Sequence, residues 1–279
     1  MAFEEALMKM MRMMRMVRMM RIVTTCSIAV GLTFVGLAVH ARAQTASLPY
    51  DHMHLAAPDP VQAVQWYQKY FGGQPLPGEG TDRLMIGKTR FVFMKAQGAQ
   101  PSAGSSIDHV GFSVPDLDAK MKQFAADGVK IVSPMQEPAG LFKLAFIEDP
   151  WGVKIEVVQD PETPGFHHIH LRAPNPDEVL TWYLEKFGGE RAKLKNRIDA
   201  VKYGEVWLLV QRGDATPSQG HAIDHLGWRT PNLSRTFADL TGKGAKSTVE
   251  PREVTIGTTK VQISFVEGPS ATRIEVVQR

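Results

Sequence analysis

Residues 107–117 read Ile-Asp-His-Val-Gly-Phe-Ser-Val-Pro-Asp-Leu, and this stretch decides the kind of fold that the chain adopts. Its first residues have the alternating side-chain directions of a short strand. Pro115 and Asp116 then form a turn, and an aspartate at this point is a typical cap for a following helix. The stretch therefore predicts a strand that leads directly into a capped helix.

The same arrangement occurs four times along the chain. A histidine followed six residues later by a proline is found at His52, His109, His168 and His225. The first two histidines are 57 residues apart, and so are the last two. Residues 51–74 align with residues 167–190 without a gap and share eleven of 24 positions. An internal repeat with an offset of 116 residues thus organises the chain.

The repeat divides the chain into two domains, residues 44–160 and 165–279, which a turn-rich Asp-Pro-Glu-Thr-Pro-Gly segment joins. Each domain contains two units in which a strand, a helix and three further strands follow one another. Besides Asp116, the residues Asp59, Asn175 and Asn232 are expected to cap the helices. The sequence predicts an α+β fold of four βαβββ modules, with curved, mainly antiparallel sheets around metal or ligand cavities.

Residues 1–43 have the features of a secretory signal peptide. Basic residues precede an apolar run at residues 22–39, and Ala41-Arg42-Ala43 offers a small-x-small cleavage site. Cleavage near Ala43 would give a periplasmic or secreted protein. The alternative is an uncleaved membrane anchor, since the apolar run is 18 residues long. An internal methionine such as Met19 or Met20 is a candidate for the true start.

Charge and cysteine content narrow the function classes. The predicted signal holds six of the 32 Lys and Arg residues and two of the 29 acidic residues, so the remainder has a net charge near −1. This charge does not favour nucleic-acid binding. The single cysteine, Cys26, lies in the signal, so the mature chain has no thiol nucleophile or thiolate ligand. We expect a small-molecule substrate, no nucleic acid, no membrane after signal cleavage, and we leave a homodimer open.

Each domain also carries a candidate ligand set for a metal ion. Besides two of the repeated histidines it has one glutamate, Glu156 or Glu275, within an Ile-Glu-Val-Val-Gln segment. Two neutral imidazoles and one carboxylate, with positions left open, suit a catalytic divalent ion such as Zn, Mn, Fe, Ni or Mg. His54 and His170 stand two residues past a repeated histidine, on the same strand face. They are candidates for proton transfer, or for support of the ligands.

Residues 107–117, together with Asp-Pro-Trp-Gly-Val-Lys-Ile-Glu at residues 149–156, resemble the vicinal oxygen chelate superfamily. That group includes glyoxalase I, extradiol dioxygenases and bleomycin-binding proteins. In it, paired βαβββ modules form a U-shaped sheet around a divalent metal, held by histidines of first strands and a glutamate of a last strand. The resemblance implies two ligand sets, His52, His109 and Glu156 in the first domain and His168, His225 and Glu275 in the second.

The resemblance implies a metal-dependent lyase, isomerase or dioxygenase that activates a small oxygen-rich substrate by Lewis-acid catalysis. Glyoxalase I relatives have a further carboxylate ligand on the last strand of a module. The corresponding residues 90–94 hold no acid in this chain, and residues 205–210 hold only Glu205, at the entry of the strand. A metal-free protein that binds or sequesters a small molecule, as bleomycin-binding relatives do, is the alternative.

Strand periodicity also predicts where substrate charge would bind. Arg172, Arg229 and Arg273 are expected on the faces that carry the ligands of the second domain. Three guanidinium groups would suit a carboxylate or phosphate, because arginine offers a planar fork for bidentate contact. The second domain is therefore expected to hold the principal site, for an anionic substrate. The alternative is that these arginines only form ion pairs with nearby acids.

Overall fold

The computed structural model describes residues 47–279, which belong to one compact unit, Gln44–Arg279. The predicted signal peptide, residues 1–43, lies outside the described residues. Within residues 47–279, none of the helices has the length and apolar character needed to cross a membrane.

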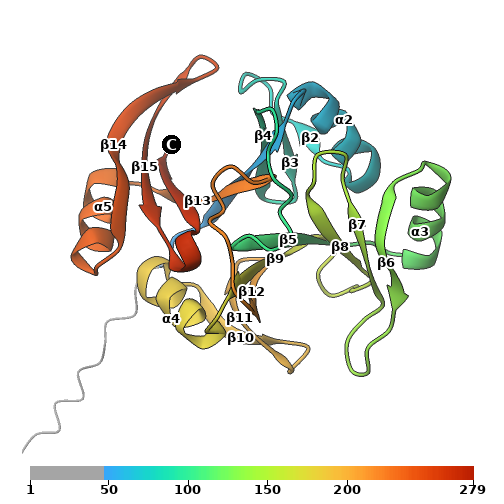
Figure 1. Cartoon of the computed structure of the whole chain (residues 1–279). Coiled ribbons are helices and arrows are strands. Elements are labelled where there is room, and N and C mark those ends of the chain that lie inside the picture. Colours follow the sequence, from blue (N-terminus) through green and yellow to red (C-terminus); the bar gives the residue numbers. More distant parts are fainter. Residues whose placement is uncertain (1–46) are drawn as a thin grey trace, which may run out of the picture. The chain divides into compact units, whose positions relative to one another are not determined.

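Four βαβββ modules follow one another along the chain, as the sequence predicts (Figure 1). Module one consists of β1 (Tyr50–Ala57), α2 (Pro60–Phe71), β2 (Gln74–Pro75), β3 (Arg83–Ile86) and β4 (Thr89–Lys95). Module two consists of β5 (Ile107–Ser113), α3 (Leu117–Ala126), β6 (Lys130–Gln136), β7 (Leu144–Glu148) and β8 (Lys154–Val158). Module three consists of β9 (Gly165–Ala173), α4 (Pro176–Phe187), β10 (Glu190–Leu194), β11 (Ile198–Tyr203) and β12 (Val206–Arg212). Module four consists of β13 (Ile223–Thr230), α5 (Leu233–Gly242), β14 (Lys246–Ile256), β15 (Thr259–Glu267), the short η1 (Pro269–Ala271) and β16 (Arg273–Gln278).

The helix caps predicted from the sequence lie where expected. The side chains of Asp59, Asp116 and Asn232 each accept a hydrogen bond from a backbone N–H of the first helical turn. These bonds satisfy donors that the helix itself leaves without a partner. Asn175 occupies the same position before α4, but its amide donates to Glu178 instead of capping the helix.

The modules combine into two eight-stranded sheets. One sheet has the order β14-β15-β16-β13-β1-β4-β3-β2 and joins module four to module one. The other has the order β10-β11-β12-β9-β5-β8-β7-β6 and joins module three to module two. Within each module the first and last strands are parallel, and the two modules of a sheet meet through antiparallel first strands. Each sheet therefore takes strands from both repeats.

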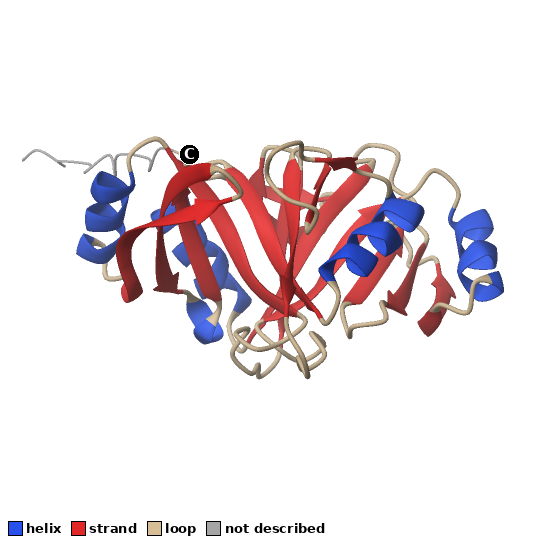
Figure 2. Cartoon of the chain, turned by 90° about the horizontal axis from the view of Figure 1, so that it is seen from above, coloured by secondary structure: helices blue, strands red, loops and turns tan. Residues whose placement is uncertain are grey.

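Each helix packs on strands of its own module, so the four helices of the described part flank the sheets (Figure 2). One apolar core continues through both sheets and includes the fully buried Tyr67, Tyr183 and Trp228. The Phe91 ring lies 4.9 Å from the Phe166 ring, which packs module one against module three. Burial of each such aromatic side chain contributes about 1.5–3 kcal/mol, so this core holds the two sheets in a fixed relation.

Candidate metal centres

Two clusters of potential metal ligands lie in the described part of the chain. In each, one donor atom from each of four residues lies within 4.8 Å of the others. We call His52, His54, His225 and Glu275 the first centre. We call His109, Glu156, His168 and His170 the second centre.

The sequence identified the residues but grouped them incorrectly. It placed His52 with His109 and Glu156, whereas His52 lies beside His225 and Glu275. The reason is strand pairing, since β1 pairs with β13 and not with β5. Each centre is consequently built from one module of each repeat, and the predicted separate set in each half is wrong.

In both centres two histidines converge on one carboxylate oxygen. Glu275 Oε2 lies 3.2 Å from His52 Nε2 and 3.1 Å from His225 Nε2. Glu156 Oε2 lies 3.2 Å from both His109 Nε2 and His168 Nε2. Burial alone would raise the pKa of each carboxyl, but the adjacent histidines outweigh it and hold the pKa well below its usual value. Two imidazole nitrogens and an ionised carboxylate in this arrangement form a donor set that suits Zn²⁺ and similar divalent ions.

An aspartate orients the histidine that follows it in three of the four strands. Asp51 Oδ2 lies 2.7 Å from His52 Nδ1, Asp108 Oδ1 lies 2.7 Å from His109 Nδ1, and Asp224 Oδ1 lies 2.6 Å from His225 Nδ1. A carboxylate at Nδ1 keeps the proton on that nitrogen and leaves the Nε2 lone pair directed at the centre. Sequence reasoning missed these aspartates because alternation places a preceding residue on the opposite strand face.

The fourth strand differs, because His167 takes the place of the aspartate. His167 Nδ1 lies 2.8 Å from His168 Nδ1, and His167 Nε2 lies 3.2 Å from Asp160 Oδ2. Burial, with repulsion from His168, lowers the pKa of His167 to about 4. His167 is therefore neutral near pH 7, and it can accept the Nδ1 proton of His168 while it donates to Asp160. The two centres differ in this one supporting group.

His54 and His170 lie where the sequence predicts, each within a centre. The His54 ring stacks on the His225 ring with 4.1 Å between centroids, and the His54 and His170 Nδ1 atoms are buried without a hydrogen-bond partner. Burial is the main cause that lowers the pKa of both residues well below its usual value. Each therefore offers an uncharged nitrogen that can accept a proton or serve as a fourth ligand.

Two glycines make room for the histidine rings. In the antiparallel pairs, Gly227 lies opposite His52 and Gly111 lies opposite His168. A Cβ atom at residue 227 would come within 2.1 Å of the His52 ring, and one at residue 111 within 2.0 Å of the His168 ring. Each centre therefore requires a residue without a side chain on the neighbouring strand.

A cavity of about 410 Å³ opens at the first centre. His52, His54, His225 and Glu275 all line it, so a small molecule within it can reach every candidate ligand. This size lies within the range of small-molecule sites.

The predicted cluster of arginines does not form as a group. Arg273 lines the cavity at the first centre, where its Nη1 lies 2.6 Å from Asp224 Oδ1. Arg172 lies on β9 in the other sheet, and its Nε donates to the Asp214 carbonyl. Arg229 is exposed near the end of β13 and does not line the cavity. The prediction of three arginines around one centre is wrong, because Arg172 of β9 belongs to the other sheet and Arg229, although on β13, is exposed outside the cavity.

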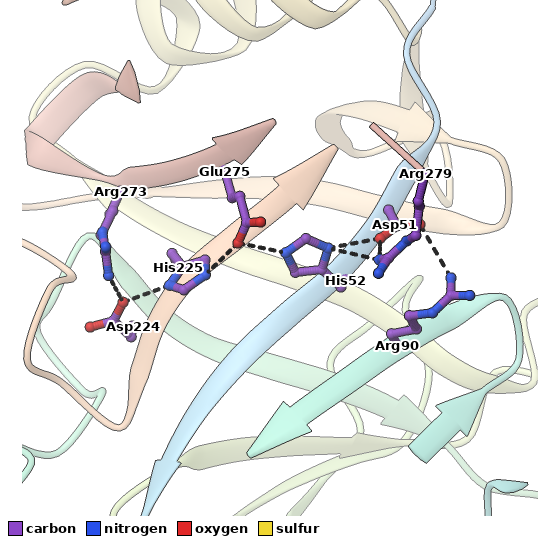
Figure 3. A network of polar contacts seen from close by, with 8 residues as sticks. All are labelled: Asp51, His52, Arg90, Asp224, His225, Arg273, Glu275 and Arg279. Carbon is purple, nitrogen blue, oxygen red and sulfur yellow. Dashed lines mark hydrogen bonds and ion pairs between the residues drawn. The ribbon is translucent and has the colours of Figure 1, made fainter. Parts of the chain in front are cut away.

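Ion pairs extend the first centre on both sides (Figure 3). From Glu275, contacts run through His225 and Asp224 to Arg273 in one direction. In the other direction they run through His52 and Asp51 to a set of two cations, Arg90 and Arg279. The cations neutralise the buried aspartates, which reduces the cost of keeping those charges away from water.

A family model described as the Glyoxalase/Bleomycin resistance protein/Dioxygenase superfamily matches residues 50–157 and 165–276. The chain belongs to this superfamily. It is 26% identical over 162 residues to a "Probable lactoylglutathione lyase, chloroplastic" of Arabidopsis thaliana, a match that covers 53% of this chain and 46% of that protein. It is 45% identical over 51 residues to a lactoylglutathione lyase of Pseudomonas aeruginosa, covering 18% of this chain and 28% of that protein. The chain thus spans less than half the length of these curated relatives.

The fold is similar to that of solved structures of the same superfamily. Glyoxalase I from Zea mays superposes with a TM-score of 0.67 at 16% identity, over 83% of this chain and 92% of that chain. At this identity the similarity establishes the architecture of two tandem domains and leaves the chemistry to the residues of the centres.

Proposed function

We propose that this protein is a divalent-metal-dependent enzyme whose reaction takes place at the first centre. The observation that carries the proposal is that two histidines and a glutamate converge and line a cavity of about 410 Å³. A bound metal would supply Lewis-acid activation of a substrate oxygen. A lyase, isomerase or dioxygenase reaction on a small oxygen-rich substrate follows from that chemistry, and a lyase is favoured by the names of the curated relatives.

The residues of the first centre would have two separate roles, metal binding and proton transfer. His52, His225 and Glu275 would hold the metal, with Asp51 and Asp224 keeping the two imidazole rings in place. His54 would move a proton to or from the substrate, because it is uncharged and lines the cavity. In the register of the sheet His54 lies beside Val92 of β4, on the strand where glyoxalase I relatives have a carboxylate ligand. If His54 takes the place of that carboxylate as a fourth ligand, it would not transfer the proton, so these two roles are alternatives.

Metal analysis tests the proposal directly. Protein purified without chelator, or stripped and reloaded with Zn²⁺, Mn²⁺ or Ni²⁺, is expected to bind two equivalents, one for each centre. Inductively coupled plasma mass spectrometry gives the stoichiometry, and calorimetry gives the affinities. Protein that neither carries nor takes up any divalent ion would contradict the proposal.

One observation favours a metal-free binding protein as the second candidate. Without an ion, His52 Nε2 and His225 Nε2 lie 3.2 Å and 3.1 Å from Glu275 Oε2, so hydrogen bonds would join these three side chains if both Nε2 atoms carry protons. A cavity that binds and sequesters a small molecule would need no more than this. The same metal analysis separates the two functions, because this candidate predicts ligand binding that chelator treatment leaves unchanged.

Replacement of His167 by aspartate is expected to tighten metal binding at the second centre. The change gives His168 the carboxylate support that the other three ligand histidines have, and such supporting groups alter metal affinity by about 10- to 100-fold. Competition with a coloured chelator measures the gain. Asp108→Asn, which weakens the support of His109, should shift the affinity of the same centre downward. Equal affinities in the His167 variant and the parent would show that this support has no effect.

We also propose that the protein is exported. The basic residues, apolar run and Ala-x-Ala site in residues 1–43 support this. Protein recovered from the periplasm or the medium of an expressing bacterium is expected to begin at Gln44, as N-terminal sequencing would show. Retention of residues 1–43 in membrane-bound protein would favour the anchor instead.

A further inference from the structure

The cavity at the first centre has two opposed walls. The β14–β15 hairpin forms one wall, and β3 with β4 forms the other. At the tip of the hairpin, a Cβ on Gly257 would lie 2.5 Å from the Gly78 carbonyl oxygen, so the tip touches the loop between β2 and β3. This contact places the hairpin across the cavity and restricts the width of any molecule within it.

Most cations that line the cavity already have an acidic partner. Arg273 contacts Asp224, Arg279 contacts Asp51, and Arg83 contacts Asp82. Arg252 of β14 and Lys95 at the end of β4 are different, because their exposed side chains form no ion pair or hydrogen bond with another described residue. A guanidinium in a cavity without an acidic partner is a site for an anion.

Apolar side chains line both walls of the cavity. On the hairpin wall, Phe265 lies at the level of Glu275, Ile263 lies opposite Arg252, and Val254 lies beyond Arg252 toward the tip. Val92, Phe93 and Met94 line the opposite wall. The cavity therefore combines the candidate metal ligands, apolar walls and the charge of Arg252.

The strand register gives the distance between the two polar ends of the cavity, Glu275 at the first centre and Arg252 on the hairpin. Glu275 pairs with Phe265, and Ile263, two residues further along β15, pairs with Arg252. Two strand spacings and two residues correspond to about 12 Å between the Cα atoms of Glu275 and Arg252. Both side chains project into the cavity, so the gap for a ligand is shorter by several ångströms.

We propose that the cavity binds an elongated organic anion. An oxygen-bearing end would reach the first centre, an apolar body of about four to six carbons would lie under the hairpin, and a carboxylate would bind Arg252. This assignment of substrate class rests on the proposed function, since it takes the first centre as the reacting end. It replaces the arginine set predicted from the sequence with Arg252.

Linear dicarboxylates test the assignment with the zinc-loaded protein. Adipate is expected to bind more tightly than succinate, which is too short to reach both ends, and 1,6-hexanediol, which lacks charge, is expected not to bind. Arg252→Gln should weaken adipate binding about 10- to 100-fold, as measured by calorimetry. Arg252→Lys should retain part of the affinity. Arg229→Gln is the matched control, because Arg229 is an arginine of the same module outside the cavity.

The outcomes separate this inference from the proposed function. Equal adipate affinity in Arg252→Gln and the parent overturns the inference, whatever metal is bound. Binding that depends on Arg252 but persists unchanged in chelator-treated protein supports the anion site and counts against the enzyme. Absence of adipate binding to the zinc-loaded parent overturns the assignment of this substrate class and leaves the metal proposal standing.

Discussion

The Glu275→Gln variant is expected to lose metal at the first centre while the second centre keeps its ion. Glu275 Oε2 is the one atom that both His52 and His225 contact, so its loss removes a ligand and the group that holds the two rings together. We expect the affinity of this centre to fall at least about 100-fold, the upper end of what a supporting residue contributes. Activity at the cavity should fall with it.

Glu156→Gln is the matched variant, because Glu156 has the same position in the second centre. It should remove the other metal equivalent and leave the cavity reaction in place. Metal content per chain and turnover, measured on both variants and on the double variant, give the full comparison. If Glu156→Gln abolishes activity and Glu275→Gln does not, the first centre is not the reaction site.

Gly227→Ala is expected to disrupt the first centre without touching a ligand. The new methyl group would lie 2.1 Å from the His52 ring, so the ring has to leave its position between Asp51 and Glu275. Overpacking of this kind lowers the free energy of unfolding by about 1–3 kcal/mol. Metal binding at the first centre should be lost as well, because His52 no longer points at it.

Two further glycines serve as controls for this prediction. Gly111→Ala should have the same effect on the second centre, through the His168 ring. Gly242→Ala, at the end of α5 with nothing within 4 Å of its new methyl group, should leave both centres and the stability close to the parent. Thermal unfolding and metal content report on all three. Retention of both metal equivalents in Gly227→Ala would show that His52 is not a ligand.

The sequence predicts the modules and the ligand residues because both depend on local patterns. The strand before each proline turn, the capped helix after it and the repeated glutamate are all readable within a few residues. The pairing of modules is not. Two strands have the pattern His-x-His, around His52 and His168, and two have His-x-Gly, around His109 and His225. The ring of a histidine in the first pattern needs a glycine opposite it, so each sheet must combine one strand of each kind. The observed pairing of β1 with β13 meets this requirement, and so does the predicted pairing of β1 with β5.

The position of Arg252 in the cavity is a second feature that the sequence pattern does not predict. Arg252 lines the cavity at the first centre because β14 pairs with β15 at the edge of the sheet, with register shifts between Ser247 and Arg252. Alternation cannot be followed through such shifts, so the face on which Arg252 lies could not be predicted. The face on which Asp51 lies could not be predicted for the same reason, since β1 shifts register between Tyr50 and His52.

The order in which the two centres can form during synthesis follows from how far apart their residues stand in the chain. His109 and Glu156 are 47 residues apart, and His168 follows soon after, so a nascent chain contains every ligand of the second centre before its last third is made. His52 and Glu275 are 223 residues apart, and the first centre must wait for the C-terminal strand. Closing so long a loop is slow, and until then β1 pairs with β4 but lacks β13 on its other side. A chain stalled before β16 would thus hold a finished second centre and an open first one, so the metal site proposed at the first centre would require the synthesis of β16.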